Sequence, residues 1–367
     1  MDPDLEPYQV LDELGAGSFG VVYSAISLKN SKHYAIKKIK CTNPENIEIA
    51  LQEMWTLTRL TEHPNIVKMI ECYLQNGGIH RVKHGEDDYL CLVEVCLKGK
   101  TYHQLDFSSS HNPRGKQLES HIPHSQLNLW LVMEYCNGGT MNDYLLERDP
   151  SPETNARFMT QLSGAVAFLH DNNVVHRDLK PDNVLVCQPK NGDPPLVKIG
   201  DFGLSKICNA SNLSHNMDIN TYQMNSACGS DYFMAPEVFE GSYTAKADIF
   251  ALGMIFCSMM ERTTCYDKES NKLLLVTCIT NGKESVPVGK ALQDDPKLTF
   301  EVLKCGRNNR LKTLVQSMVA ISPDERPTAE ELHKKLQDVV KRQPGWTVCV
   351  TSQRSSRGKR KRRYTVS

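Results

Sequence analysis

Three glycines lie close together near the start of the chain, in the segment GAGSFGVV. Gly15, Gly17 and Gly20 stand between two segments with the alternating pattern of strands. Glycine lets a backbone approach phosphate oxygens without a side chain in the way. Dinucleotide-binding folds use the same spacing, and a plain glycine-rich hairpin also fits it. A dinucleotide loop should open a helix, whereas this one opens a strand from Val21 to Ser27, which argues against a nicotinamide cofactor.

A lysine follows on the next strand pattern, in the segment AIKK. Lys37 lies inside an apolar strand, where an unpaired ammonium group would be costly to bury. It therefore needs an anion, and the two candidates are a phosphate of ATP and Glu53 on the following helix pattern. Glu53 shares a face of that helix with Leu57 and Leu60, which we expect to point inward. Taken alone, Lys37 also fits an ordinary lysine of an edge strand.

Two further motifs complete a recognisable set. HRDLKPDN spans His176 to Asn183, and DFG spans Asp201 to Gly203. With the glycine loop and AIKK, they match the signature motifs of protein kinases. The match continues in the family's order through MAPE (Met234 to Glu237), ADIFALG (Ala247 to Gly253) and DERP (Asp324 to Pro327). The chain thus resembles the protein kinase family from about Tyr8 to Lys341, and in that family Arg326 would pair with Glu237.

This resemblance implies a role for each charged residue, because phosphoryl transfer needs neutralised charge and aligned groups more than covalent chemistry. Asp178 would orient the substrate hydroxyl and take its proton, and Lys180 would steady the charge of the transferred phosphate. Lys37, positioned by Glu53, would grip the α and β phosphates. The residues expected to hold Mg²⁺ between the phosphates are Asn183 and Asp201.

The resemblance also implies where ATP binds. Adenine would lie between Val22, Ala35 and Leu185, with Met133 as the gatekeeper and the backbone of residues 134–136 as the hinge. Plain core packing also explains these apolar residues, and the two interpretations are compatible. The residues expected to line the ATP site are Leu14, Gly15, Ala16, Gly17, Ser18, Phe19, Gly20, Val22, Ala35, Lys37, Met133, Glu134, Cys136 and Leu185.

The details of the motifs favour transfer of the γ-phosphate of ATP to serine or threonine hydroxyls of proteins. Tyrosine kinases usually carry alanine or arginine near the position of Lys180. Ser230 fits the serine/threonine pattern, in which a hydroxyl bonds the catalytic aspartate and lysine. A rival hypothesis is a pseudokinase scaffold, but such proteins typically lose the lysine, the catalytic aspartate or the magnesium aspartate. A small-molecule phosphotransferase is weaker, because the MAPE segment and the long stretch before it indicate a surface for docking protein substrates.

The periodicities predict a strand-rich N-terminal part and a helix-rich C-terminal part, and the resemblance implies the two-lobed α+β fold of the family. Strands are expected within 8–40 and over Ile66–Leu74 and Leu129–Met133, with a helix after the capping sequence Asn43-Pro44-Glu45. Ser151-Pro152-Glu153 starts another helix, and the chain is mainly helical from residue 235 to about 340. We expect a kinase domain over 1–341, with a small antiparallel-sheet lobe over about 8–133, a hinge over 134–139 and a larger helical lobe over about 140–341.

Residues 75–128 form an insert far longer than a hairpin needs. Tyr89–Val95 within it is expected to be a strand, and the remainder an exposed interaction loop, since its histidine spacings match no common zinc pattern. The position of the insert, with CTNPENIEIALQE and AKADIFALGM, resembles the subgroup of PDZ-LIM-interacting kinases. That resemblance implies a PDZ-LIM or actin-associated partner.

Charge and composition limit the remaining function classes. The 43 basic and 43 acidic residues give no net charge, so we expect neither a specific nucleic-acid partner nor a membrane. The apolar run Ile249–Met260 is too short to cross a bilayer. Thirteen cysteines without regular spacing favour a reducing compartment, hence a nuclear and/or cytoplasmic protein. The basic run Arg354–Arg363 lies in a tail, 342–367, expected to be disordered. It is either an import signal read by importin or a solvated basic tail.

Regulation is expected in the segment from Asp201 to Glu237. Arg177 precedes the catalytic aspartate, and in the family such an arginine often receives a phosphate from this segment. We expect one phosphorylated hydroxyl, most plausibly within 221–226, among Ser205, Ser211, Ser214, Thr221, Tyr222 and Ser226.

Two residues bear on the substrate preference. Thr140 stands where kinases that prefer basic substrates often carry an acid, which argues against such a preference. Asp182, beside the catalytic loop, argues for it.

Overall fold

The computed structural model describes most of the two expected lobes. Ser18 and Phe19 of the glycine loop, five of the six candidate phosphorylation sites, much of the insert and the basic tail lie outside the described residues. The described residues are 5, 7–17, 20–60, 62–75, 79–82, 88–97, 100–109, 127–189, 191–208, 217–218, 230–268, 270–281, 284–298, 300–301 and 309–341.

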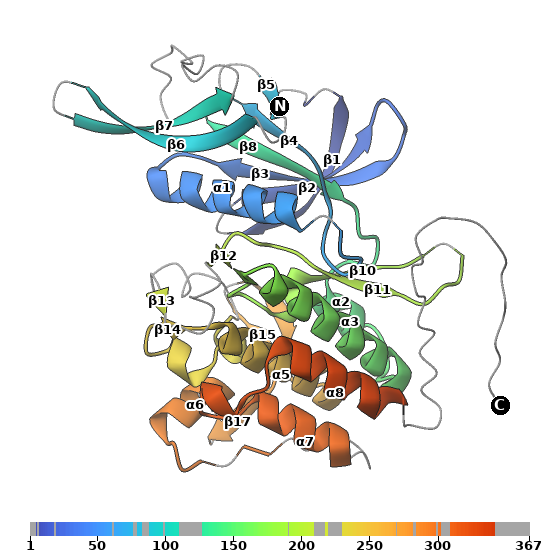
Figure 1. Ribbon diagram of the computed structural model, residues 1–367. Coiled ribbons are helices and arrows are strands. Elements are labelled where there is room, and N and C mark those ends of the chain that lie inside the picture. Colours follow the sequence, from blue (N-terminus) through green and yellow to red (C-terminus); the bar gives the residue numbers. More distant parts are fainter. Residues whose placement is uncertain are drawn as a thin grey trace, which may run out of the picture.

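The N-terminal lobe is built on a six-stranded sheet in which every neighbouring pair is antiparallel (Figure 1). The strand order is β1-β2-β3-β8-β4-β5. The bounds are β1 Tyr8–Gly17, β2 Gly20–Ser27, β3 His33–Lys40, β4 Met69–Gln75, β5 Ile79–Val82 and β8 Asn128–Glu134. The three strands expected within 8–40 are confirmed, whereas the strand expected from Ile66 begins only at Met69. Ile66 instead makes an isolated parallel bridge with Ile199 of the other lobe.

Helix α1, Pro44–Arg59, lies against this sheet and confirms the capping prediction. The side chain of Asn43 accepts a hydrogen bond from the backbone N–H of Asn46 at 2.8 Å, which satisfies one free donor of the first turn. Ile47, Leu51 and Met54 are at most 2% exposed and belong to the main hydrophobic core. The apolar stripe therefore fixes which face of α1 meets the sheet.

The insert contains more regular structure than expected. Its predicted strand is observed as β6, Asp88–Leu97, and the prediction of loop is wrong for Ile79–Val82 and Lys100–Ser109, which are strands. β5 extends the main sheet, and β7, Lys100–Ser109, pairs with β6 in a separate antiparallel hairpin. β6 contacts α1, so the hairpin is seated on the lobe (Figure 1). Long-range pairing with β4 and local hairpin closure overrode the polar composition that had suggested a loop.

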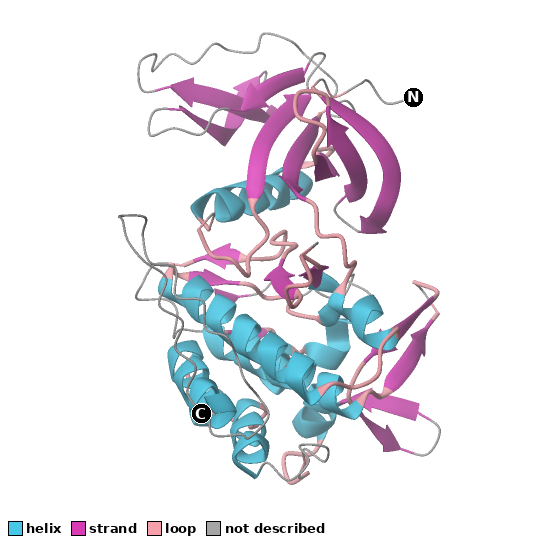
Figure 2. Cartoon of the chain, turned by 90° about the vertical axis from the view of Figure 1, so that its right-hand side faces the viewer, coloured by secondary structure: helices cyan, strands magenta, loops and turns pink. Residues whose placement is uncertain are grey.

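The C-terminal lobe gathers most of the helices, as Figure 2 shows. Its centre is α5, Ala245–Glu261, whose residues from 247 to 259 are all buried. The apolar run Ile249–Met260 is therefore core, and among the described residues no helix is long and apolar enough to cross a membrane. The other α-helices are α2 Met141–Leu146, α3 Pro152–Asp171, α6 Val288–Asp294, α7 Asn309–Met318 and α8 Ala329–Lys341. The expected two-lobed α+β class is confirmed.

Short strands and single turns of 3-10 helix connect these helices. The strands are β9 Val174–Val175, β10 Val184–Cys187, β11 Leu196–Ile199, β12 Lys206–Ile207, β13 Met217–Asp218, β14 Ser242–Tyr243, β15 Thr264–Asp267, β16 Lys272–Leu275, β17 Cys278–Asn281 and β18 Glu284–Pro287. The 3-10 turns are η2 Pro181–Asn183, η4 Ser230–Phe233, η5 Pro236–Val238 and η6 Pro323–Glu325.

Two hairpins follow α5, in a part of the chain that was expected to be mainly helical. β15 pairs with β16, and β17 pairs with β18. The first turn is fixed locally: Asp267 accepts hydrogen bonds from the backbone N–H and the hydroxyl of Ser270, and Asn271 has a positive φ of 53°. Such side-chain bonds stabilise a turn against a helix.

Candidate active site

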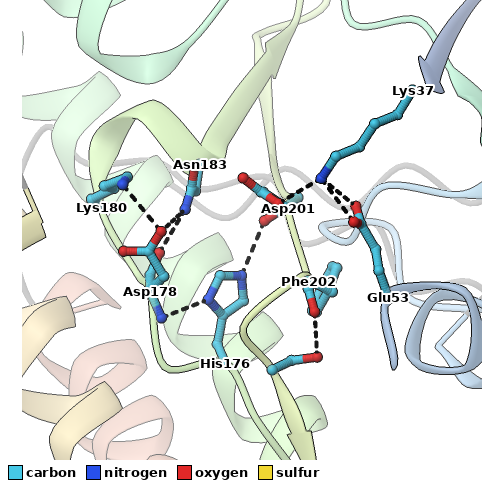
Figure 3. A network of polar contacts seen from close by, with 10 residues as sticks. Lys37, Glu53, His176, Asp178, Lys180, Asn183, Asp201 and Phe202 are labelled. Atoms are coloured by element: carbon cyan, nitrogen blue, oxygen red, sulfur yellow. Dashed lines mark hydrogen bonds and ion pairs between the residues drawn. The ribbon is translucent and has the colours of Figure 1, made fainter. Parts of the chain in front are cut away.

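Lys37 of β3 reaches two carboxylates from two different elements (Figure 3). Its Nζ lies 2.9 and 2.8 Å from the two oxygens of Glu53 on α1 and 2.8 Å from Oδ1 of Asp201. Lys37 is 6% exposed and Glu53 1%, so each charge needs the other. Burial by itself lowers the pKa of Lys37, but the charges of Asp201 and Glu53 outweigh it and the pKa is raised. Lys37 therefore stays protonated, and it is a paired core lysine instead of an ordinary edge-strand one.

Asp201 joins this cluster from the C-terminal lobe. It follows β11 and has a positive φ of 55°, a strained conformation for a residue with a side chain. Its side chain is 43% exposed, in contrast to that of Glu53. Burial raises the pKa of Asp201, but the charge and hydrogen bond of Lys37 outweigh it, so the pKa is lowered. An ionised carboxylate is thus presented where a cation can reach it.

The catalytic-loop residues form a second cluster, between β9 and η2. The side-chain amide of Asn183 donates to Oδ2 and to the backbone oxygen of Asp178, both at 2.8 Å. Nζ of Lys180 lies 3.1 Å from the same Oδ2 and donates to the hydroxyl of Ser230 at 2.7 Å. Ser230 in turn donates to Oδ1 of Asp178 at 2.8 Å. Asp178 is therefore held on both carboxylate oxygens.

Helix α5 holds the loop that carries this cluster. Oδ2 of Asp248 accepts the backbone N–H of His176 at 2.9 Å, and Oδ1 accepts that of Arg177 at 3.0 Å. Asp248 also contacts His170 and accepts from the hydroxyl of Tyr243 at 2.9 Å. Burial raises the pKa of Asp248, but the hydrogen bond and charge of His170 outweigh it and the pKa is lowered. A buried anion therefore fixes the backbone of the loop.

The imidazole of His176 joins the two clusters. Its Nε2 lies 3.0 Å from the backbone oxygen of Gly200, the residue before Asp201, and its ring centre is 4.9 Å from that of Phe202 (Figure 3). His176 and Phe202 are both fully buried. The position of Asp201 relative to Asp178 is thus set by core packing.

The register of the N-terminal sheet brings the expected ATP residues together. Gly15 of β1 lies opposite Val22 of β2, which lies opposite Lys37 of β3. Ala35 lies opposite Met133 of β8, and these two residues are 8% and 9% exposed. Leu14, Ala16 and Gly17 also lie in β1, Gly20 in β2, Glu134 at the end of β8, Cys136 in the hinge and Leu185 in β10.

The glycines of the loop differ in what surrounds them. A side chain at Gly20 would begin 2.2 Å from the backbone oxygen of Lys38, so glycine is required there by the pairing of β2 with β3. A side chain at Gly15 or Gly17 would meet no atom within 4 Å. These two glycines border open space, as a loop that must approach a ligand would.

The family comparison agrees with this geometry. The protein kinase domain, as a family, matches residues 8–119 and 118–336. The chain belongs to the protein kinase family. It is similar to the serine/threonine-protein kinase ATG1 of Kluyveromyces lactis, with 27% identity over 349 residues, which are 88% of this chain and 35% of that protein. It is likewise similar to ATG1 of Kluyveromyces marxianus, with 29% identity over 326 residues, 82% of this chain and 34% of that protein. The chain thus spans about a third of the length of these relatives.

The kinase has a buried ion pair behind the catalytic loop, between the residues of MAPE and DERP expected to meet. Nη1 and Nη2 of Arg326 lie 2.6 and 2.8 Å from the two carboxylate oxygens of Glu237. Arg326 is 1% exposed and also donates to the backbone oxygens of Ala320 and Ile321. The bidentate geometry satisfies a guanidinium that would otherwise be costly to bury.

Several features of the site have no signal in the sequence. The hydroxyls of Thr56 on α1 and Ser205 lie 3.1 Å apart, which connects α1 to the segment after DFG. Ser205 also donates to the backbone oxygen of Phe202 and is 4% exposed, so burial argues against it as a phosphorylation site. Only the folded chain brings Thr56 and Ser205 together. Thr140, by contrast, is the N-cap of α2 and bonds Asp143 at 2.8 Å, a pair whose spacing is typical of a helix start.

Proposed function

We propose that this kinase transfers the γ-phosphate of ATP to serine and threonine hydroxyls of proteins. The observation that carries the proposal is that the lysine, glutamate and two aspartates that phosphoryl transfer needs are all present and joined by short contacts. Lys37 pairs with Glu53 and Asp201, and Asp178 is held by Asn183 and Ser230. The two relatives are both called serine/threonine-protein kinases, which supports the same acceptor.

In this proposal Asp178 acts on the acceptor hydroxyl. A carboxylate that accepts the hydroxyl proton both aims the oxygen and makes it a better nucleophile. Lys180 lies 3.1 Å from Asp178 and is 8% exposed, so its charge acts in a region from which most water is excluded. There it opposes the negative charge of the group being transferred. Asn183 and Ser230 keep the carboxylate from rotating.

The donor set also fits the nucleotide and its metal. Asn183 and Asp201 offer an amide oxygen and an ionised carboxylate, and Mg²⁺ prefers oxygen ligands, usually one or two from carboxylates with phosphates and water completing the shell. When bound, Mg²⁺ neutralises the phosphate charge that otherwise repels the acceptor. Lys37 would face the α and β phosphates, and the loop from Leu14 to Gly20 would cover them. Val22, Ala35 and Leu185 would enclose the adenine, behind which Met133 would lie, and the backbone from Glu134 to Cys136 would pair with it.

The test is transfer from labelled ATP, with Mg²⁺, to degenerate peptide libraries that contain serine and threonine or tyrosine as the only acceptors. The Asp178→Asn protein is run beside the parent as a matched control. Label on the serine/threonine library with the parent and not with Asp178→Asn supports the proposal. Label on the tyrosine library alone, or equal label with both proteins, would overturn it.

The second candidate is a pseudokinase-like scaffold that binds partners through the insert and the tail. The seated hairpin β6–β7 favours a binding role for the insert, because it provides a regular surface. Nucleotide binding without transfer, after incubation with candidate activating kinases, is the result that would favour the scaffold.

Activation by phosphate is proposed at Arg177. Nε of Arg177 is buried and has no hydrogen-bond partner among the described residues, and burial lowers the pKa of this guanidinium. Such a group is relieved by a phosphate, which accepts charge-assisted hydrogen bonds. The hydroxyl groups that could carry this phosphate are those of Ser211, Ser214, Thr221, Tyr222 and Ser226. Intact-mass measurement and peptide mapping of active protein would reject the idea if all five were unmodified.

We further propose protein partners and a cellular location for this kinase. The insert and the segments CTNPENIEIALQE and AKADIFALGM support the PDZ-LIM-interacting subgroup, with a PDZ-LIM or actin-associated partner. The basic run Arg354–Arg363 supports an importin partner and a nuclear location in addition to the cytoplasm. Imaging of the chain without residues 354–367 tests the import role, which unchanged nuclear entry would reject. Failure of the full chain to bind a purified PDZ-LIM protein would reject the subgroup's partner.

A further inference from the structure

Two cysteines meet where the hinge touches the C-terminal lobe. Cys136 lies in the hinge and Cys187 is the last residue of β10, and their Sγ atoms are 2.8 Å apart, joined by an S–H···S hydrogen bond. Both are free thiols. The bonded distance in a disulfide is about 2.05 Å. The two sulfur atoms therefore need to move together by less than about 1 Å to form a bond.

Hydrogen bonds fix the backbone next to the two cysteines. The N–H of Gly138 donates to the oxygen of Val186 at 2.8 Å, and the N–H of Val186 donates to the oxygen of Gly139 at 2.9 Å. The side chain of Asn137 bonds the backbone N–H and oxygen of Gln188 at 2.7 and 3.0 Å. In the register set by the bridge between Thr140 and Leu185, Cys187 lies opposite Gly138, and Cys136 reaches it diagonally from two residues further along.

The surroundings make the two thiols unequal. The hydrogen bond between the two thiols lowers the pKa of Cys187, and the charge of Lys198 adds to this, against the effects of burial and Glu134. The same hydrogen bond and burial raise the pKa of Cys136. Cys187 is also the more accessible, because it is half-buried whereas Cys136 is 8% exposed. Cys187 is thus the thiol that ionises and meets an oxidant first.

We propose that Cys136 and Cys187 form an oxidation site, at which a hydroperoxide produces a disulfide that ties the hinge to β10 and weakens nucleotide binding. The Cys187 thiolate attacks the O–O bond of the peroxide and becomes a sulfenic acid, while the other peroxide oxygen leaves as an alcohol or water. The Cys136 thiol, on losing its proton, then attacks the sulfenic sulfur. The S–S bond forms and the hydroxyl group leaves as water. Two thiols lose two hydrogens and two electrons, and the peroxide gains them.

The effect on the nucleotide follows from the position of Cys136. Its own backbone is part of the hinge proposed to pair with adenine, so this consequence rests on the proposed nucleotide site, whereas formation of the disulfide does not. Bond formation draws the sulfur of Cys136 toward β10 and fixes its side chain. The backbone of Cys136 is pulled with its side chain, and the loss of one backbone hydrogen bond to adenine weakens binding about tenfold.

The experiment treats the full chain with limiting hydrogen peroxide and maps its peptides without reduction. We expect a peptide pair joined through Cys136 and Cys187, released by dithiothreitol, and affinity for a fluorescent ATP analogue that falls about tenfold and recovers on reduction. Cys187→Ser should bind the analogue like the parent and should be insensitive to peroxide. Cys278→Ser, which removes another half-buried thiol, is the matched control and should respond like the parent.

Each failure has its own meaning. A Cys187 found as sulfinic acid beside an unmodified Cys136, or cysteines oxidised elsewhere with no joined pair, would overturn the oxidation site. A joined pair with unchanged analogue affinity would overturn the link to nucleotide binding. Because analogue binding and peptide mapping require no phosphate transfer, both results are independent of whether the chain proves to be an active kinase.

Discussion

Ser230 donates a hydrogen bond to Asp178 at 2.8 Å and accepts one from Lys180 at 2.7 Å. Its side chain thereby holds together the proposed proton acceptor and the proposed phosphate-steadying charge. Ser230 is 4% exposed and begins η4, which leads into the MAPE segment. The placement of that segment and the geometry of the catalytic loop therefore depend on the same hydroxyl group.

Replacing Ser230 tests this connection. Ser230→Ala leaves Asp178 and Lys180 without their shared hydroxyl, and hydrogen bonds to charged groups contribute about 1.5–3 kcal/mol. We expect kcat to fall roughly tenfold to a hundredfold with little change in the KM for ATP. Ser230→Thr keeps a hydroxyl and is the control, with activity close to the parent's. Equal kcat for Ser230→Ala and the parent would show that the hydroxyl positions nothing.

The buried pair of Lys37 and Glu53 should show that loss of one charge is worse than loss of both. Lys37→Met leaves a carboxylate that is 1% exposed without its partner, and breaking such a pair costs about 3–5 kcal/mol of stability. Lys37→Met combined with Glu53→Leu removes the stranded charge. Urea unfolding should show the double variant to be more stable than the single one, while both are inactive. A double variant less stable than the single one would contradict this assignment.

The glycines of the loop should separate into two classes. Gly20→Ala places a methyl group against the backbone oxygen of Lys38, so the free energy of unfolding should fall by about 1–3 kcal/mol. Gly17→Ala meets no neighbour and should change stability by less than about 0.5 kcal/mol. It should instead raise the KM for ATP severalfold, because the new methyl group would face the phosphates at the proposed ATP site. Thermal unfolding and ATP titration of the two variants measure both effects. Equal stability of Gly20→Ala and Gly17→Ala would refute the packing argument.

His63 predicts a pH dependence of stability. Burial, together with the charges of His333 and Lys198, lowers the pKa of His63 from 6.5 to about 4. Its Nδ1 accepts the backbone N–H of Asn65 at 3.1 Å, and its ring stacks on Phe168 with centres 5.0 Å apart. A proton on Nδ1 would break that hydrogen bond.

Because the folded pKa lies below the unfolded one, the unfolded chain binds the proton more readily as pH falls below about 6.5. The contribution of neutral His63 to the free energy of unfolding is therefore complete above that pH and is lost between about 6.5 and 4. The loss is on the order of 1 kcal/mol by pH 5. Urea unfolding at pH 7 and pH 5 measures it. His63→Gln keeps an acceptor but cannot titrate in this range, so its loss should be smaller. An identical pH dependence in parent and variant would remove His63 as the cause.

Much of the fold was predictable where local and global preferences agree. The cap Asn43-Pro44, the stripe of Ile47, Leu51 and Met54, and the positions of the first three strands all agree with the folded chain. The hairpins were not predicted, for a physical reason. β7 and β15–β18 are short or polar, and they are stabilised by cross-strand pairing and by side-chain hydrogen bonds in their turns. Neither leaves a periodic apolar signal.

For the candidate site, the motifs indicated residue types and their order but not their contacts. The pairing of Lys37 with Glu53 could be expected, because a buried charge needs a partner. The contact of Lys37 with Asp201, the hydrogen bond of Thr56 with Ser205 and the meeting of Cys136 with Cys187 could not. Each joins residues far apart in sequence, and no spacing rule connects them.

The carboxylate of Asp248 also decides how long the catalytic loop stays in place. Loop amides ordinarily exchange their hydrogens with deuterated water quickly, because small openings expose them. Those of His176 and Arg177 are bonded to the fully buried carboxylate of Asp248 in the first turn of α5. Opening the loop would leave that buried carboxylate without two of its hydrogen-bond donors, which is costly. We therefore expect these two loop amides to exchange as slowly as those of the helical lobe to which they are bonded.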